Sequence, residues 1–301
     1  MFERILVPLD GSKTAEFVIP YVAEIASRFD SHVIVTRVSD PDVSIYASKP
    51  YLETVAENMR LQIKNFRARN KCEVELKVLM GNPANEILNC AVETECKLIV
   101  MASRGETNYS PWPLGNVAAK ILRAASSPVL LIRKQADDEA LKEKRLIKKI
   151  LLPLDGSRLS EAAIPAATEL SRKTGAAVIL FRAIEPDVVV TTPGVAMTRG
   201  MAVEHGRTVI TSQAKPLALK YLNGMKEAMV KDGAKVSTAI GKGPAADQII
   251  DYAEANSVDF ITMSTHGLSG IGRWVFGSVT DKVLHAGDTP VLVIRPGKTE
   301  R

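Results

Sequence analysis

The chain has 301 residues, of which 46% are hydrophobic, and it carries a formal net charge of +5. This length and apolar content are enough for two globular domains, each with its own core. No run approaches the ~20 apolar residues of a membrane-spanning helix and no signal-peptide pattern is present, so we expect a cytoplasmic protein without membrane contact.

The opening pattern of the chain occurs a second time. The segment ILVPLDGSKTAEFVIP at 5–20 returns as ILLPLDGSRLSEAAIP at 150–165, an offset of 145 (155 − 10 for the shared aspartate). The same offset aligns HVIVTRVSDPDV at 32–43 with AVILFRAIEPDV at 177–188. Such an internal repeat indicates a duplicated structural unit.

The later part of each copy aligns at a larger offset. NCAVETECKLIVMASRG at 89–105 matches DYAEANSVDFITMSTHG at 251–267, an offset of 162 (267 − 105), which also aligns SPVLLIR at 127–133 with TPVLVIR at 289–295. The difference of 17 residues (162 − 145) places an insertion in the second copy, mainly around 188–208. Its Pro and Gly content indicates a mobile segment, which is either a lid or partner contact, or a loop without function.

Two domains, 1–134 and 147–296, follow from this repeat. A charged linker joins them near 135–146, and the densest basic cluster, KEKRLIKK at 142–149, is interpreted as solvated. The other basic residues are dispersed, and no nucleic-acid recognition motif accompanies them. We therefore predict no nucleic-acid partner.

Short apolar runs such as RILVPL, HVIVTRV and LIVMAS alternate in each copy with segments of helical spacing. Apolar strands separated by helices indicate a parallel sheet that is buried on both faces. The predicted fold class is α/β, with two tandem doubly wound domains that each contain a five-stranded parallel sheet. Pro20 and Pro165 fall within the first helical segment of each copy, where we expect a kink or a restart of the helix.

A carboxylate follows the first strand of each copy, at Asp10 and Asp155 in the motif PLDGS. Ligands of open parallel sheets bind outside the carboxyl ends of the strands, so this aspartate is placed to accept hydrogen bonds from a ribose or a base. Asp-Gly-Ser is also ordinary turn and helix-capping chemistry. Both interpretations remain open on the sequence alone.

A glycine-punctuated arc follows the fourth strand of the second copy and reads GLSGIGRWVFGSV from Gly267 to Val279. Its glycines let backbone amides approach a bulky anion, and Gly277 and Ser278 open the next helix with free N–H groups and a favourable dipole. Arg273 within the arc could add a charge-assisted contact, or stay solvated. The arc predicts a phosphate site.

The first copy changes this arc. It keeps Gly105 and Gly115 but reads GETNYSPWPLGNV, with Pro111 and Pro113 inside the arc and Glu106 near its start. Prolines remove amide donors and stiffen the backbone, and the glutamate repels an anion. We therefore predict that phosphate binding is lost or weakened in the first copy.

Cysteines and histidines add little chemistry. Cys72, Cys90 and Cys96 are too few and too irregular for a disulfide framework or a zinc site and are interpreted as packed thiols. His266 is the histidine next to the arc, and its counterpart is Arg104, which favours a cationic or hydrogen-bonding side chain over a metal ligand. We predict no catalytic residues and no metal site.

With these motifs in place, the chain resembles the tandem universal stress proteins. The resemblance covers both halves and rests on ILVPLDGS, on the turns GNPANEI and GPAADQI, and on STHGLSGIGRWVFGSVTDKVL. It implies a Rossmann-like, adenine-nucleotide-binding fold with strand order 3-2-1-4-5, and pairing through the last strands. The two copies should thus form an internal pseudo-dimer, and two chains could form a homodimer.

The ATP-binding subgroup of that family has a glycine, two residues, a glycine, nine residues, and then a glycine followed by Ser or Thr. The second copy has the last two elements, Gly267 and Gly277-Ser278, but Ser264 replaces the first glycine, and Ala102 stands there in the first copy. A small residue still permits close approach. The resemblance then implies the following binding residues, with ATP as the ligand and Mg²⁺ as a companion ion: Pro153, Asp155, Ala183, Met263, Ser264, Thr265, His266, Gly267, Gly277, Ser278 and Val279.

Three functions compete on this sequence. The leading hypothesis is a stress-response binding module, whose second domain takes up an adenine nucleotide and thereby changes the surface seen by an unidentified regulatory protein partner. The second is a slow ATPase, although no SGGxDS or HxGH motif and no convergent base, nucleophile and metal ligand can be assembled. The third is a protein without a nucleotide, which acts through its paired domains or binds an apolar metabolite.

Overall fold

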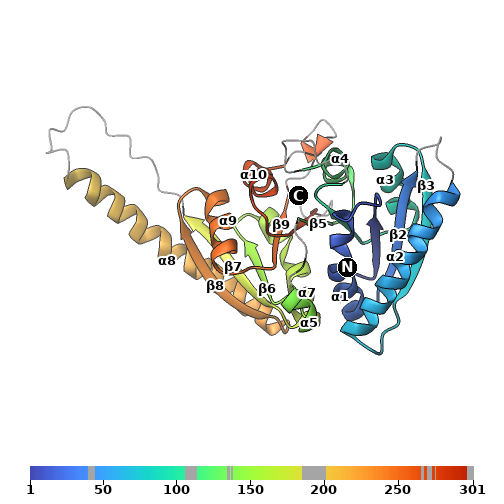
Figure 1. Cartoon of the computed structure of the whole chain (residues 1–301). Coiled ribbons are helices and arrows are strands. Elements are labelled where there is room, and N and C mark those ends of the chain that lie inside the picture. The colour runs from blue at the N-terminus through green and yellow to red at the C-terminus, as the bar shows by residue number, and fades with distance from the viewer. Residues whose placement is uncertain are drawn as a thin grey trace.

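The computed structural model describes the chain in nine stretches. They are 1–39, 45–105, 114–133, 136, 138–184, 201–265, 268–269, 273–274 and 276–296. Within them, each copy of the repeat forms an α/β domain with a five-stranded parallel sheet, as expected (Figure 1).

Strands and helices alternate along the first domain. Its elements are β1 (Arg4–Pro8), the 3-10 turn η1 (Ala15–Val18), α1 (Ile19–Phe29), β2 (His32–Ser39), α2 (Ile45–Phe66), β3 (Glu73–Met80), α3 (Pro83–Glu93), β4 (Leu98–Ala102), α4 (Asn116–Ala124) and β5 (Val129–Ile132). A short helix, α5 (Asp138–Lys142), lies in the linker.

The second domain repeats this order. Its elements are β6 (Lys149–Pro153), α6 (Arg158–Glu161), α7 (Ile164–Thr174), β7 (Ala177–Ile184), α8 (Met201–Lys231), β8 (Lys235–Lys242), α9 (Ala245–Ala255), β9 (Phe260–Ser264), α10 (Ser278–Ala286) and β12 (Val291–Ile294). Within the arc, β10 (Leu268–Ser269) pairs antiparallel with β11 (Arg273–Trp274), and β11 lies against α4 of the first domain (Figure 1).

The two sheets join into one. The strand order is β3-β2-β1-β4-β5-β12-β9-β6-β7-β8, which is 3-2-1-4-5 read inward from each end. All pairs within a domain are parallel, whereas β5 and β12 pair antiparallel with Leu130 opposite Leu292 and with Val129 opposite Val293. Since 292 − 130 equals the repeat offset of 162, these two leucines lie on the pseudo-two-fold axis. The predicted internal pseudo-dimer is confirmed.

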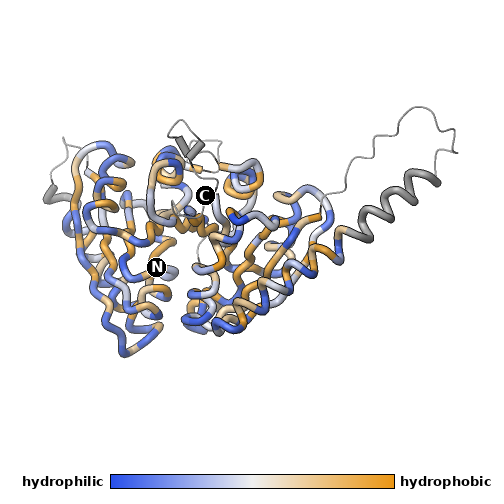
Figure 2. Tube along the Cα trace, turned by 180° about the vertical axis from the view of Figure 1, so that it is seen from behind, coloured by the Kyte–Doolittle hydropathy of each residue, from blue (hydrophilic) through white to orange (hydrophobic). Residues whose placement is uncertain are grey.

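Two hydrophobic cores cover the two faces of this sheet. Neighbouring residues of β1 alternate between them, with Val7 in one core and Leu6 in the other, as the pleat of a strand requires. Each core also contains the matching residue of β6, Leu152 or Leu151. The apolar strands form the interior of both domains, beneath more polar helix surfaces (Figure 2).

The two prolines restart the first helix of each domain, which was one of our two expectations for them. Pro20 lies in the first turn of α1 directly after η1, and Pro165 lies in the first turn of α7 after the short α6. A proline is tolerated there because the first amides of a helix have no acceptor within the helix. The break lets the chain turn sharply after the first strand, where the site lies.

The linker is solvated only in part: Lys142, Glu143 and Lys144 are exposed, as their charge suggested, but the residues that follow are held in place. Leu146 and Ile147 are buried, and their amides donate to Oε2 of Glu24 on α1 over 2.7 and 3.1 Å. The next two amides, of Lys148 and Lys149, donate to Oδ2 of Asp259, both over 2.7 Å. Carboxylates from both domains therefore clamp the chain just before β6.

Arginines are exchanged across the domain boundary. Arg133, after β5, donates to the carbonyl oxygens of Val283 and Leu284 at the end of α10, the former over 3.1 Å. Arg295, after β12, donates to the carbonyl oxygen of Leu122 in α4. The last carbonyl oxygens of a helix accept no hydrogen bond from an amide of the same helix, and they carry the negative end of its dipole. Each domain thus caps the site helix of the other.

Part of the insertion in the second copy is helical. We expected a mobile segment over 188–208, but the backbone is helical from Met201, and 188–200 lie outside the described residues. The helix α8 has 31 residues against 22 in α2, so at least nine extra residues extend a helix that projects from the second domain (Figure 1).

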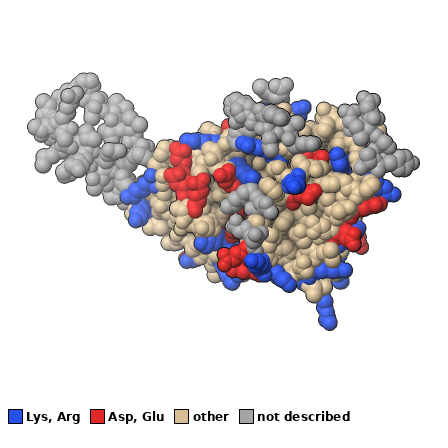
Figure 3. Space-filling model, in the orientation of Figure 1, with Lys and Arg blue, Asp and Glu red and all other residues tan. Residues whose placement is uncertain are grey.

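The surface carries charges of both signs. On the face shown in Figure 3, lysine and arginine side chains are interspersed with aspartate and glutamate. Among the helices of the described stretches, we find none that combines the length and the apolar content needed to cross a bilayer.

Candidate functional site

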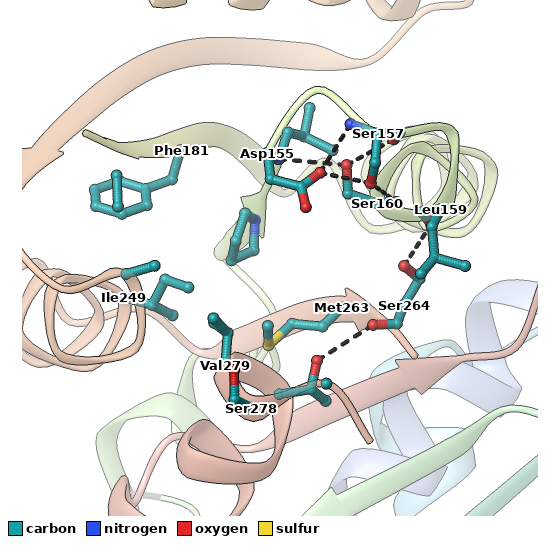
Figure 4. Close-up of a pocket in the computed structure, with 16 residues that line it drawn as sticks. Asp155, Ser157, Leu159, Ser160, Phe181, Ile249, Met263, Ser264, Ser278 and Val279 are labelled. Carbon is teal, nitrogen blue, oxygen red and sulfur yellow. Dashed lines mark hydrogen bonds between the residues drawn. The ribbon is translucent and has the colours of Figure 1, made fainter. Parts of the chain in front are cut away.

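A cavity of about 160 Å³ opens in the second domain at the carboxyl ends of its strands. Its walls come from the ends of β6, β7 and β9, from α9, and from the first turn of α10 (Figure 4). This is the position at which parallel α/β sheets bind ligands. Eight residues predicted from the sequence line it: Pro153, Asp155, Ala183, Met263, Ser264, Gly277, Ser278 and Val279.

The turn after β6 presents Asp155 to this cavity. Gly156 has φ +92°, a conformation that other residues rarely adopt, and a Cβ there would lie 3.1 Å from Nη1 of Arg182. The Arg182 guanidinium in turn lies 5.2 Å from the ring centre of Tyr221, whose hydroxyl donates to Oε1 of Glu161 over 2.8 Å. This Arg–Tyr–Glu brace supports the turn.

Asp155 acts in the local turn and also faces the cavity. Its Oδ1 accepts from the amide and the hydroxyl of Ser157 over 2.8 and 2.6 Å, while Ser157 itself caps α6 by accepting from the Ser160 amide over 3.1 Å. The other carboxylate oxygen points away from this turn, toward the cavity (Figure 4). The turn interpretation is confirmed for Oδ1, and the ligand-binding interpretation stays a prediction for the other oxygen.

The turn keeps the Asp155 carboxylate ionised. Burial opposes the charged form, but the hydrogen bonds from Ser157 and Ser160 outweigh it and lower the pKa of this carboxyl below its usual value. At neutral pH the side chain is thus a hydrogen-bond acceptor only. It suits ribose hydroxyls or an exocyclic amine, and it repels phosphate.

The two ends of the cavity differ in polarity. Phe181 and Ile249 lie at one end, and both are buried and apolar (Figure 4). At the other end, Ser264 donates to the carbonyl oxygen of Leu159 and so ties β9 to α6. Thr280 donates to the carbonyl oxygen of Ser264 over 3.4 Å. A flat ring fits the first end and a polar group the second.

The head of α10 offers an amide without a backbone partner. Gly277 is the N-cap residue of this helix, and its N–H has no backbone acceptor among the described residues. In the first domain, the equivalent amide of Gly115 donates to the carbonyl oxygen of Ser103 over 2.7 Å. The two helix heads therefore differ in the group that would meet an anion.

Three other predicted residues lie elsewhere. Thr265 is buried outside the cavity lining, and its amide donates to the carbonyl oxygen of Ile294 over 3.1 Å. His266 and Gly267 lie outside the described residues, as do Gly270 and Gly272 of the arc. In the described part of the chain, no three His, Cys, Asp or Glu side chains cluster as metal ligands would.

The first domain has a cavity at the equivalent place. It measures about 220 Å³ and is lined from the ends of β1, β2 and β4 and the first turn of α4. The stiffened arc predicted for this copy falls mostly on 106–113, outside the described residues. What the structure shows is an open cavity with different walls.

Sequence reasoning missed the hydroxyls of the second cavity. Ser160 and Thr280 line it, but the glycine pattern of the sequence does not point to these two residues. The repeat itself carried the signal, because their counterparts at the offsets of 145 and 162 are Ala15 and Ala118. Polar residues that become alanine in one copy mark positions where the two sites have diverged.

Known proteins match both halves of this chain. A family model described as the universal stress protein family matches residues 1–133 and 146–295. A universal stress protein of Mycolicibacterium smegmatis is 27% identical over 97% of this chain and 97% of its own length. One from Synechocystis is 23% identical over 97% of this chain and all of its own length.

Solved structures share the fold over the full length. A universal stress protein from Archaeoglobus fulgidus superposes with a TM-score of 0.66 at 19% identity, covering 99% of this chain and 100% of its own. The structure of a putative universal stress protein from Pseudomonas aeruginosa gives a TM-score of 0.67 at 18% identity, covering 98% and 93%.

Proposed function

Because the chain belongs to the universal stress protein family, we propose that it is a regulatory binding module whose second domain takes up ATP or a related adenine nucleotide. Binding would alter the surface that the protein presents to a regulatory partner. The site is the cavity between β6, β9 and the head of α10.

One observation carries this proposal: the Gly277 amide at the head of α10 has no backbone acceptor in the described part of the chain. The amides of a first helical turn, together with the helix dipole, stabilise a phosphate. Ser278 and Val279 follow in the same turn and line the same cavity. A phosphate at this position would meet several donors without a rearrangement of the helix.

The rest of the cavity suits the nucleoside. The base fits the apolar end beside Phe181 and Ile249, and the free oxygen of Asp155 accepts from the ribose or the base. Pro153 and the backbone of Ala183 complete this end. We propose Mg²⁺ only as the companion of a bound triphosphate.

We favour binding over catalysis. Asp155 is fixed as an acceptor by Ser157, and the hydroxyls of Ser264 and Thr280 donate to backbone carbonyls. In the described stretches, none of these three groups is paired with a histidine or lysine that would activate it as a nucleophile. Hydrolysis, if it is detected, should be slow and incidental.

Calorimetric titration of the full chain with Mg·ATP tests the proposal. Gly277→Pro removes the amide hydrogen at a backbone angle, φ −63°, that proline accepts. A hydrogen bond to a charged group contributes about 1.5–3 kcal/mol. The affinity should therefore fall by about tenfold or more.

Two controls make this result specific. Gly277→Ala keeps the amide, and it should bind ATP more tightly than Gly277→Pro does. Gly115→Pro makes the same change in the first domain, at φ −70°, and should leave ATP binding intact. Absence of heat and of a thermal shift at millimolar ATP would exclude the nucleotide, and phosphate release measured in the same samples would separate a module from an ATPase.

A further inference from the structure

We propose that the cavity of the first domain binds an uncharged aromatic molecule of one or two rings, and not a phosphate-bearing nucleotide. The proposal concerns β1, β4 and α4 and is independent of nucleotide binding in the second domain. It rests on the composition of the cavity walls, on the cavity size, and on the groups at its mouth.

Hydroxyl groups of the second cavity are replaced by methyl groups in the first. Ser160, Ser264 and Thr280 line the second cavity, whereas alanine stands at each equivalent position of the first. These alanines are Ala15, Ala102 and Ala118. All three are buried. The substitutions remove three hydroxyl groups from the cavity wall, and they leave methyl groups at these positions in the same framework.

Other apolar residues line the cavity, together with the polar or charged Asp10, Ser103, Arg104 and Asn116. Leu9, Ile87 and Met101 are buried and line the cavity from β1, α3 and β4. An apolar cavity of about 150 Å³ stays dry and holds benzene. At about 220 Å³ the first cavity is larger than that and has room for a second fused ring. Filling it would bury apolar surface on both partners.

The mouth of the cavity disfavours an anion. The Gly115 amide at the head of α4, which would otherwise meet a phosphate, is already bonded to the Ser103 carbonyl oxygen. A carboxylate oxygen of Asp10 lies only 2.1 Å from the place of a Cβ on Gly105, so the acid is packed against the start of the arc. A negative group entering there would meet the Asp10 carboxylate, which offsets the charge of Arg104 in the same lining, and no open amide of Gly115. An uncharged ligand meets neither penalty.

The test uses 5-fluoroindole as the probe, with fluorine NMR line widths of the full-length protein as the readout. The wild type should bind with a saturable 1:1 response. Ala118→Leu places three extra carbons in the cavity, and it should weaken binding by about tenfold or more, since one methylene in such a pocket changes affinity by that factor. The double variant Ala102→Ser, Ala118→Thr restores the hydroxyls of the second domain and should also weaken it.

A matched change in the second domain locates the site. Thr280→Val preserves the shape of that cavity and should leave fluoroindole binding unchanged. Excess ATP should not displace the probe. Circular dichroism melting of each variant verifies the fold, and the milder double variant keeps the test valid where Ala118→Leu unfolds.

Three outcomes would overturn the proposal. The first is that the wild type shows no saturable binding of the probe. The second is that Ala118→Leu and the double variant both bind the probe as tightly as the wild type. The third is that Thr280→Val no longer binds the probe. The last result would transfer aromatic binding to the second cavity. A failure of ATP to bind would leave this test unaffected, so the two proposals fail separately.

Discussion

The turns after β1 and β6 have the same support but face different cavities. At each turn an arginine contacts the glycine and lies over the ring of a tyrosine, whose hydroxyl donates to a glutamate. These residues are Arg37, Tyr51 and Glu16 in the first domain, and Arg182, Tyr221 and Glu161 in the second. The cavity linings differ: three alanines of the first cavity stand where the second cavity has two serines and a threonine. Duplication therefore kept the residues that shape the backbone and changed those that would contact a ligand.

The largest difference between the halves concerns the buried carboxylate of α1 and its counterpart on α7. Glu24 is fully buried and accepts two amides, whereas the side chain of Glu169 is 33% exposed and pairs with the Met1 amino group over 3.4 Å. Glu24→Ala should lower the free energy of unfolding by about 2–4 kcal/mol, because it leaves buried donors unpaired. Glu169→Ala should cost about 1 kcal/mol or less. Urea unfolding of both variants measures the difference.

The arginine exchange should be symmetric, in contrast to the carboxylates. Arg133→Met and Arg295→Met each remove a charged donor from the end of the opposite helix, α10 or α4. Each should destabilise the protein by about 1.5–3 kcal/mol in the same unfolding assay. A large effect at one arginine and none at the other would mean that the pseudo-two-fold relation does not extend to the energetics.

The pH dependence of stability should differ in sign between the carboxylates that hold the linker, Glu24 and Asp259, and the site residue Asp155. Burial raises the pKa of Glu24 and of Asp259, so between the unfolded and folded values the native state binds more protons than the unfolded state. Their contribution is present below the unfolded pKa and is lost as the pH rises through the folded pKa, by about 1.4 kcal/mol for each pH unit that separates the two pKa values. Glu24→Gln should reduce this loss between about pH 4 and neutrality in thermal melts.

Asp155 has the opposite sign. Its pKa is lowered, so its contribution is present above the unfolded value of 3.8 and is lost as the pH falls through the folded value. Comparing Asp155→Asn with the wild type in acid melts isolates this effect. A wild type that gains stability from this carboxyl on acidification would contradict the hydrogen-bond assignment.

The smallest effect should fall on the shared brace, equally in both halves. Tyr51→Phe and Tyr221→Phe each remove one hydrogen bond to a glutamate, of 3.0 and 2.8 Å. Each should cost about 0.5–1.5 kcal/mol of unfolding free energy. Ligand affinities at both cavities should stay unchanged in calorimetry, since the tyrosines support the turns without lining either cavity.

The features that repeat were predictable from the sequence. The five-stranded parallel sheets and the helix restarts at Pro20 and Pro165 follow from apolar periodicity and proline geometry, while the strand order and the β5–β12 pairing were implied by the resemblance to the universal stress proteins. The linker was not, because its local charge suggested exposure. The register offered a correction, since Ile147 aligns with the buried Phe2 at the offset of 145. Only Leu146 and Ile147 of this stretch are buried, and no local pattern encodes the distant Glu24 carboxylate that accepts their amides.

The candidate site was predictable where the backbone defines it and less so where side chains meet. Pro153, Asp155 and Gly277 were expected in the cavity and lie there. The targets of Arg133 and Arg295 could not be predicted, because equal residues in two copies do not reveal that each contacts the other copy. The hydrogen bond of the Gly115 amide depends on the Ser103 carbonyl oxygen, twelve residues earlier in the chain, and no local sequence pattern predicts that contact.

The antiparallel junction of β5 and β12 also fixes the stoichiometry of the assembly. Since one chain supplies both edges, their local concentration does not fall on dilution, and two unlike domains always meet one to one. The same junction occupies the sheet edges of β5 and β12, through which separate single-domain subunits would associate. Two copies of this chain would therefore have to meet through another surface, and within one chain the two unequal domains form a permanent pair.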